Sequence, residues 1–237
     1  MNPCDLCGTV NDAQATSCKS CGNAIVSSTP PASRRLRIIP PAGGEGQWLE
    51  LPPGEFICGR APEASIRLED PFVSPRHAQL VVGASVWITD LGSPNGVFLR
   101  LRGPTPLQAD DEVRLGQQRL RLEALPRPSG AMGGGRIWGS GDRGHHFRLA
   151  RVLEGGGTGE AMALADGDYL IGRDEGGMTF PGDLAVSGRH AILSVSGEQL
   201  SLRDLGSANG TFVRLHEESE LVPGDQLLMG QQQLRLE

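Results

Sequence analysis

The sequence lacks any long hydrophobic run. Its uninterrupted apolar stretches are a handful of residues long, far short of the roughly 18 that a membrane-spanning helix requires. The N-terminus has neither the basic segment nor the apolar segment that marks a secretory signal. These absences argue against a transmembrane helix and an export signal, and we expect the protein to be cytoplasmic.

Lysine and aromatic residues are scarce. Lys19 is the only lysine among 22 basic residues, and aromatic side chains make up 4 % of the chain. The net charge of −6 argues against a chain whose main task is to bind the phosphate backbone of nucleic acid. Because the arginine excess runs through the whole sequence, only an arginine's position can identify it as a binding residue.

Cysteine is almost absent beyond the first 21 residues, where only Cys58 remains. The other four follow the spacing C-x2-C-x10-C-x2-C, at Cys4, Cys7, Cys18 and Cys21. In a reducing cytoplasm such pairs are typical of zinc thiolate sites, and the alternatives are a redox C-x-x-C pair or four free thiols. Each pair is followed by a glycine, Gly8 or Gly22, which suits a tight turn with positive φ. Cys58, next to Phe56 and Ile57, has the character of a small buried hydrophobe.

These pairs resemble the two knuckles of a short bacterial zinc ribbon, which we assign to residues 3–24. So short a segment cannot bury a core, so a metal must supply the folding energy. The resemblance implies one structural Zn²⁺ bound by all four cysteines. The ribbon is then either an N-terminal cap or an additional surface for contacting proteins.

The remainder of the chain contains an internal repeat. Residues 115–123 recur as residues 229–237, and residues 90–96 recur as residues 204–210, both at an offset of 114. His77 matches His190 at an offset of 113. The sequence therefore predicts a zinc ribbon at 3–24, a linker at 25–35, a first domain at 36–123, a Gly/Pro-rich linker at 124–146 and a second domain at 147–237.

Both linkers have compositions that do not build a packed core. The first contains Ser27-Ser28-Thr29-Pro30-Pro31, and the second contains two prolines and three consecutive glycines. We expect both to be mobile. Thr29 or a neighbouring serine is a hypothetical phosphorylation site that would then bind one of the domains in the same chain.

Within each repeat the dominant hydrophobic period is two. Leu120 and Leu122 alternate with arginines, and Leu200 and Leu202 alternate with polar residues, as expected for half-buried strands. Turn signals such as Asn95-Gly96 and Asn209-Gly210 recur between the strands. The predicted fold class is all-β, with two antiparallel β-sandwiches in tandem after the small zinc ribbon.

Three short motifs occur in the same order in both repeats. The first repeat contains Gly59-Arg60, Ser74-Pro75-Arg76-His77 and Asn95-Gly96, and the second contains Gly172-Arg173, Ser187-Gly188-Arg189-His190 and Asn209-Gly210. This pattern resembles the forkhead-associated (FHA) domain, whose loops bind phosphothreonine peptides at one end of a β-sandwich. With the ribbon, the resemblance covers about 85 % of the chain. It implies that Arg60, Ser74, Asn95, Arg173, Ser187 and Asn209 bind phosphopeptide and that His77 and His190 are structural.

The residue types fit this chemistry. An arginine offers a bidentate fork to a phosphate dianion and a serine hydroxyl adds a donor, whereas the asparagines, by analogy with the family, would hold the peptide main chain. A catalytic Ser-His pair is the competing interpretation. It leaves the upstream arginine unexplained, and no oxyanion donor or third orienting group is evident. We therefore expect no enzymatic activity.

Both repeats depart from the family at two auxiliary positions. Many members have a polar residue after the motif serine, where this chain has Pro75 and Gly188, and another before the Asn-Gly pair, where it has Pro94 and Ala208. Both prolines also lack a backbone N–H donor and restrict their neighbours. The sequence therefore predicts that the second site binds phosphothreonine better than the first.

The resemblance implies a non-enzymatic adaptor that reads phosphothreonine left by a Ser/Thr protein kinase. Its expected partners are phosphothreonine-containing proteins, either the kinase or its substrates, with two sites on one chain adding avidity. A phosphate-independent scaffold with decayed FHA sites is the main alternative. Nucleic-acid binding through the zinc ribbon is a third, and the few basic residues near the ribbon make it the weakest.

Overall fold

A computed structural model describes residues 2–4, 6–12, 15, 17–23, 34–41, 43–126, 138–139 and 144–237. Within these residues all regular secondary structure is β-strand, and the structure contains no helix long and apolar enough to cross a membrane. Most of both predicted linkers, together with Thr29, lies outside the described residues. The N-terminal segment contains a two-stranded antiparallel sheet of β1 (Asn2–Pro3) and β2 (Val10–Asn11).

Each sequence repeat contributes ten strands. The first supplies β3 (Arg34–Ile39), β4 (Gln47–Leu51), β5 (Gly54–Gly59), β6 (Ile66–Arg67), β7 (Ala78–Val82), β8 (Val86–Asp90), β9 (Val97–Arg100), β10 (Thr105–Leu107), β11 (Glu112–Leu115) and β12 (Gln118–Ala124). The second supplies β13 (Phe147–Val152), β14 (Thr158–Leu164), β15 (Gly167–Gly172), β16 (Met178–Thr179), β17 (Ala191–Ser196), β18 (Gln199–Asp204), β19 (Thr211–Arg214), β20 (Ser219–Leu221), β21 (Gln226–Met229) and β22 (Gln232–Leu236). The predicted all-β class is confirmed.

The alternation of side chains explains these strands. In β12, Leu120 and Leu122 are buried, whereas Arg119 and Arg121, which alternate with them, keep contact with solvent, because successive residues of a strand point to opposite faces. The same alternation appears in β18, where Leu200 and Leu202 are buried. One apolar face per strand is enough to pack two sheets into a sandwich.

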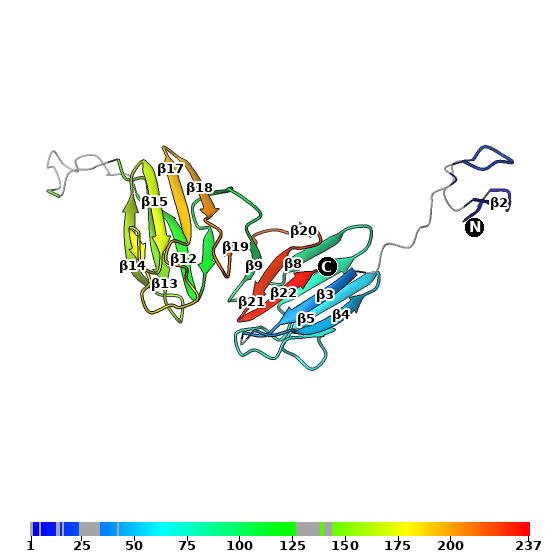
Figure 1. Cartoon of the computed structure of the whole chain (residues 1–237), viewed down its shortest axis with the longest axis horizontal. Coiled ribbons are helices and arrows are strands. Elements are labelled where there is room, and N and C mark those ends of the chain that lie inside the picture. The colour runs from blue at the N-terminus through cyan, green and yellow to red at the C-terminus, as the bar shows by residue number, and fades with distance from the viewer. Residues whose placement is uncertain are drawn as a thin grey trace, which may run out of the picture.

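The strands do not stay within their own repeats. The sheet order β20-β8-β7-β5-β6 places a strand of the second repeat beside β8 of the first, and β10-β18-β17-β15-β16 places a strand of the first repeat beside β18 of the second. The next two strands of each repeat, β11–β12 and β21–β22, form hairpins that also lie in the sandwich of the other repeat. Strand β22 pairs with β3, and strand β12 pairs with β13. In Figure 1 the red strand β22 accordingly lies beside the blue β3, with β21 on its other side. The two repeats have exchanged their last three strands.

Two composite sandwiches result. The first sandwich consists of residues 34–100 and 219–237, and the second consists of residues 105–124 and 147–214. Each has its own core, and each core contains leucines from both repeats, such as Leu227 and Leu234 in the first and Leu115 and Leu120 in the second. The contiguous domains predicted at 36–123 and 147–237 therefore exist as sequence repeats but are not the folded bodies.

A local pseudo-twofold axis relates the two repeats. At the centre of the ten-stranded sheet β14-β13-β12-β11-β19-β9-β21-β22-β3-β4, strand β9 pairs with its own repeat equivalent, β19. Leu99 faces Val213, and Phe98 and Arg100 face Arg214 and Phe212, so equivalent residues meet as in an isologous dimer. Because the repeats are so alike, either one presents a nearly equivalent partner strand. The sequence pattern therefore could not indicate which repeat completes which sandwich.

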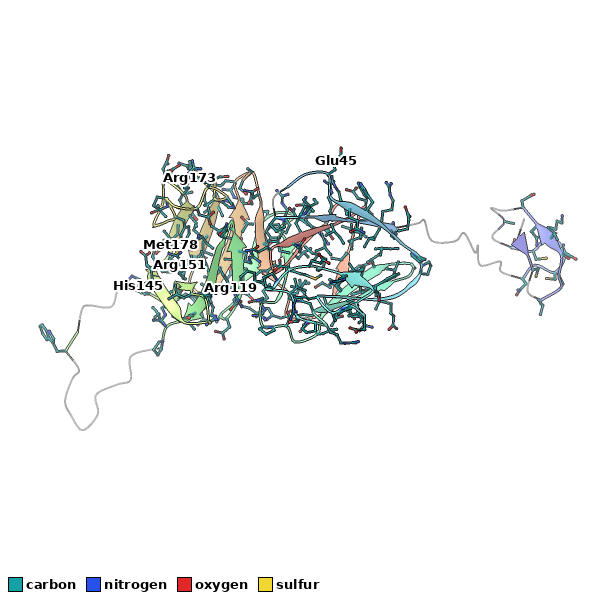
Figure 2. The ribbon with its side chains drawn as sticks, turned by 90° about the horizontal axis from the view of Figure 1, so that it is seen from below. Glu45, Arg119, His145, Arg151, Arg173 and Met178 are labelled. Carbon is teal, nitrogen blue, oxygen red and sulfur yellow. The ribbon has the colours of Figure 1, made fainter. Side chains whose placement is uncertain are left out.

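Polar contacts join the two repeats within the second sandwich, beside the junction where β19 meets β9 of the first sandwich. The buried carboxylate of Glu112 lies 2.6 Å from Arg119, 2.9 Å from Arg121 and 3.1 Å from Arg214, the last of which belongs to the second repeat. Figure 2 shows Arg119 near this junction. Burial would raise the pKa of Glu112, but the arginine contacts outweigh it and hold this pKa below its ordinary value, so the group is ionised.

Two further contacts obey the pseudo-symmetry. Arg102 donates from Nε to Asp225 Oδ1 at 2.7 Å, and the equivalent His216 has its Nε2 2.9 Å from Asp111 Oδ1. Each joins the short segment that crosses between the sandwiches, 101–104 or 215–218, to the hairpin of the other repeat. Short crossing segments of this kind favour strand exchange over folding back.

Candidate functional sites

The motif residues of each repeat converge on one loop end of a sandwich. The backbone N–H of Arg60 donates to Ser74 O at 2.9 Å, and that of Arg173 donates to Ser187 O at 2.8 Å. The preceding residue, Gly59, has no room for a side chain, because a Cβ there would lie 2.1 Å from Pro75 O. Gly172 meets Gly188 O in the same way. The glycine of each Gly-Arg pair thus permits the loops to touch.

Both motif histidines are fully buried beneath these loops. The backbone N–H of Ser74 donates to His77 Nδ1 at 3.0 Å, and that of Ser187 donates to His190 Nδ1 at 3.0 Å. A ring that accepts at Nδ1 carries its proton on Nε2, which lies 3.0 Å from Gly96 O in the first site. In the second site, burial lowers the pKa of His190. The two rings thus join the serine loop to the Asn-Gly loop in each site.

A second layer of residues, which the sequence argument did not single out, shapes the Asn-Gly loop. Asp90 accepts hydrogen bonds from the backbone and hydroxyl of Ser93, and Asp204 accepts the equivalent bonds from Ser207. Burial favours a higher pKa for Asp204, but bonds from Thr211 and Ser207 prevail and lower it. The signal was present in the sequence, because Asp-Leu-Gly-Ser recurs unchanged in both repeats.

The two asparagines rest on the serine loops. Asn95 Nδ2 donates to Phe72 O at 2.8 Å, and Asn209 Nδ2 donates to Ala185 O at 2.8 Å. Arg60 also contacts its loop, donating from Nε to Val73 O at 3.2 Å. The arginine, serine and asparagine predicted from each repeat are therefore brought together. Each triplet comes entirely from its own repeat.

The charge at the two sites differs. The guanidinium of Arg173 lies 3.0–3.2 Å from the carboxylate of the next residue, Asp174, and this contact raises the pKa of Arg173. Arg189 pairs with Glu175 at 3.2 Å. In the first site Ala61 follows the arginine, and among the described residues no carboxylate pairs with Arg60. Figure 2 shows Arg173 on the outer part of the second sandwich, away from the junction.

The N-terminal cysteines form one cluster. Their four Sγ atoms lie within 4.8 Å of one another, with Cys4 and Cys21 3.6 Å apart and Cys7 and Cys18 3.5 Å apart. Sulfurs bound tetrahedrally to zinc at about 2.3 Å lie about 3.8 Å apart, so the spacing fits a closed zinc site.

Two matching knuckles build this cluster. Gly8 N donates to Cys4 O at 2.8 Å and Gly22 N donates to Cys18 O at 2.9 Å, with both glycines at positive φ, +70° and +71°. The buried Asn11 joins the knuckles, donating to Thr9 O at 2.8 Å and accepting from the backbone N–H of Lys19 at 3.0 Å. Sequence reasoning missed Asn11, because a lone asparagine carries no spacing signal.

Cys58 is not part of the cluster. It lies in the core of the first sandwich with 1 % of its surface exposed, and burial raises the pKa of its thiol to about 12. A thiol that stays protonated is neither a metal ligand nor a nucleophile.

Two family models match the chain. Residues 56–116 match the FHA domain, and residues 151–237 match the cytoplasmic domain of an inner-membrane component of type III secretion systems. The first match ends at residue 116, in the β11–β12 turn, and so beyond the point where the strands are exchanged.

Curated relatives establish the family. The chain is 33 % identical over 102 residues, 42 % of its length, to the oxoglutarate dehydrogenase inhibitor of Corynebacterium diphtheriae, of which it covers 71 %. It is 40 % identical over 79 residues to the FHA domain-containing protein FhaB of Mycobacterium tuberculosis, which is 33 % of this chain and about half of that protein, 51 %. The chain belongs to the FHA-domain family.

Solved structures of FHA domains also align with the chain. The FHA domain of the CT664 protein from Chlamydia trachomatis is 15 % identical, with 86 % of this chain and 96 % of that chain covered and a TM-score of 0.37. The FhaA FHA domain complexed with the intracellular domain of Rv3910 is 14 % identical, with 86 % and 100 % covered and a TM-score of 0.34.

Proposed function

We propose that the protein is a phosphothreonine-binding adaptor in Ser/Thr kinase signalling. The observation that carries this proposal is the convergence of Arg60, Ser74 and Asn95 on one loop end, with the Arg60 guanidinium unpaired by any described carboxylate. A phosphate dianion would accept the arginine fork and the serine hydroxyl. The asparagine amide would fix the peptide main chain beside it.

The relatives support a regulatory rather than enzymatic role. The family includes an oxoglutarate dehydrogenase inhibitor and a glycogen accumulation regulator, and a structure of EmbR contains a phosphopeptide. We infer that this chain likewise acts by binding, with the phosphorylated kinase or its substrates as partners. We place it in the cytoplasm, where the kinase products occur and where cysteine pairs stay reduced.

The test uses the full chain and a phosphothreonine peptide library. We expect the wild-type chain to capture phosphothreonine peptides and to ignore their unphosphorylated and phosphoserine counterparts. The Arg60→Ala/Arg173→Ala double variant should capture none, while circular dichroism shows an unchanged β-sheet spectrum. Equal capture by the wild type and the folded double variant would contradict the proposal.

One observation favours a phosphate-independent role for the second site. Its arginine is already occupied by Asp174 at 3.0 Å, so a phosphate would have to displace a carboxylate. On this interpretation the second repeat serves chiefly as a scaffold. Strong phosphopeptide binding by an Arg60→Ala chain would remove this candidate.

We further propose that Cys4, Cys7, Cys18 and Cys21 hold one structural zinc ion. The four sulfurs form a closed donor set, so the metal would stabilise the knuckles rather than perform chemistry. Since residues 3–24 contribute no described apolar core beyond Cys4, Cys18 and Ala15, the metal would supply most of their folding energy.

Metal analysis tests this assignment. The purified, reduced chain should carry about one zinc ion, and the Cys4→Ser/Cys18→Ser variant should carry none, because two ligands do not retain structural zinc. Both should retain the unfolding transition of the sandwiches. The Cys58→Ala variant is the matched control and should keep its zinc. A metal content unchanged by the double substitution would overturn the site.

A further inference from the structure

The serine loop of the first site is held from two directions. Asp70, which is 4 % exposed, begins this loop, and its Oδ1 accepts the backbone N–H of Phe72 at 2.8 Å. Its Oδ2 accepts the backbone N–H of Gln231 at 2.6 Å. Gln231 lies 161 residues away, in the β21–β22 turn of the other repeat. One carboxylate therefore shapes the loop and fastens it to a hairpin that its own repeat does not supply.

The second site repeats this arrangement with the repeats reversed. Asp183 Oδ1 accepts the backbone N–H of Ala185 at 3.0 Å, and its Oδ2 accepts from Gln117 N at 2.8 Å and from Gln118 Nε2 at 2.7 Å. Gln117 lies in the β11–β12 turn of the first repeat. The same contact thus occurs twice, and in each case an aspartate of one repeat fastens its serine loop to the hairpin turn of the other repeat.

The hairpin turns fit closely against the loops. Gly230 has φ +59°, and a Cβ there would lie 2.9 Å from both Asp70 Oδ2 and Val73 Cγ2. Met229 pairs with Gln232 across the two-residue turn, and a glycine with positive φ at its first position is typical of type II′. From the second sandwich, Arg114 donates to Gly230 O at 2.6 Å, which fixes the turn from its other side.

The fastened loop carries the groups expected to meet the phosphopeptide. Phe72 O receives Asn95, Val73 O receives the Arg60 side chain, and Ser74 ends the loop. The Val73 side chain is buried in the core of the first sandwich, with 1 % of its surface exposed. A displacement of this segment would therefore move all three side chains relative to one another, and binding that needs several donors in fixed positions is sensitive to such shifts.

We propose that each phosphothreonine site is completed in trans by the hairpin of the other repeat, with Asp70 and Asp183 as the positioning residues. The site of the first repeat thus depends on the β21–β22 hairpin, residues 226–236, and the site of the second depends on the β11–β12 hairpin, residues 112–124. This inference rests on the proposed phosphothreonine binding for its functional readout. Its structural readout is independent of any ligand.

Two matched substitutions test the direction of the dependence. Gln117 and Gln231 are exposed, are repeat equivalents and hold the loops through their backbone N–H, which proline removes. In the full chain, we expect Gln231→Pro to increase deuterium uptake of residues 70–77 and leave residues 183–190 unchanged. Gln117→Pro should do the reverse. Alanine at either position retains the N–H and should leave both loops protected.

The binding readout follows the same logic. In an Arg173→Ala chain, where the first site alone is measured, Gln231→Pro should weaken binding of a phosphothreonine peptide on the order of tenfold, the effect of losing one hydrogen bond to a charged group. Gln117→Pro should leave it unchanged. Two outcomes would overturn the proposal. One is weaker binding in the Gln117→Pro chain with unchanged binding in the Gln231→Pro chain. The other is increased deuterium uptake in the serine loop of the substituted repeat with no change in the serine loop of the other repeat. Loop protection that changes as expected in a chain that binds no phosphopeptide would contradict the proposed function alone.

A disulfide pair tests the exchange without disturbing either turn. Pro106 faces Ser201, and its repeat equivalent Glu220 faces Trp87, at the spacing that antiparallel partners and disulfides share. We expect the Pro106→Cys/Ser201→Cys chain to form a linked peptide on oxidation, as identified by mass spectrometry. The Pro106→Cys/Trp87→Cys chain should not link, because that pair would meet only if each repeat kept its own strands. Linkage in the second chain and not in the first would overturn the proposal.

Discussion

Arg60→Ala is expected to remove most phosphothreonine-peptide binding from the full chain, whereas Arg173→Ala is expected to leave most of it. The reason is electrostatic. Asp174 already occupies the Arg173 guanidinium with contacts of 3.0–3.2 Å, while Arg60 has no described carboxylate partner. A lost charge-assisted contact costs about 1.5–3 kcal/mol, which is roughly tenfold to more than a hundredfold in Kd. Calorimetric titration of the two full-length variants with one peptide measures this difference.

This ranking reverses the one predicted from Pro75 and Pro94. The missing backbone donors would still disfavour the first site, but a carboxylate beside the proposed phosphate position would act directly on the dianion. Asp174→Ala in an Arg60→Ala chain should therefore raise the affinity of the second site. Asp168→Ala, which removes a carboxylate at the other end of β15, is the charge-matched control and should not. A full chain that loses binding with Arg173→Ala and keeps it with Arg60→Ala would restore the original ranking.

Glu112→Ala is expected to destabilise the protein more than any surface substitution. It would leave Arg119, Arg121 and Arg214 facing one another without their shared counter-charge, and its own side chain is only 4 % exposed. Breaking a buried ion pair costs about 3–5 kcal/mol. The arginine side chains keep 22–29 % of their surface in solvent, so we expect about 2–3 kcal/mol, measured by urea unfolding of the full chain.

The pseudo-symmetry supplies the matched control. The position equivalent to Glu112 in the first sandwich is Gln226, whose Oε1 accepts from Arg100 at 2.9 Å. Glu112→Gln should therefore be milder than Glu112→Ala, because an amide oxygen still accepts from the arginines. Gln226→Ala should cost less than Glu112→Ala, since a single arginine is affected. Equal stability of all three variants would show that the arginine cluster is fully solvated.

Local patterns in the sequence determined the elements and the site residues. Alternation in 118–124 and 199–204 defined strands, because one buried face per strand is a local property. The Gly-Arg, Ser-x-x-His and Asn-Gly motifs located loops that do converge, because their connections lie within one repeat. The cysteine spacing likewise brought four sulfurs together. In each case the residues that meet are fixed by short-range turns or by neighbouring strands.

Only the tertiary structure decided which strands complete which sandwich. The segments 112–123 and 226–237 are identical at seven of twelve positions and are apolar at the same four buried positions. Each therefore fits either core with similar hydrophobic pairing, and no local pattern distinguishes the two solutions. The outcome depends on the crossing segments 101–104 and 215–218, on the β9–β19 pairing and on the contacts that Arg102, Glu112 and His216 make between the repeats. The pairing of Asp174 with Arg173 was equally hidden, because adjacency in sequence does not determine whether two side chains point toward one another.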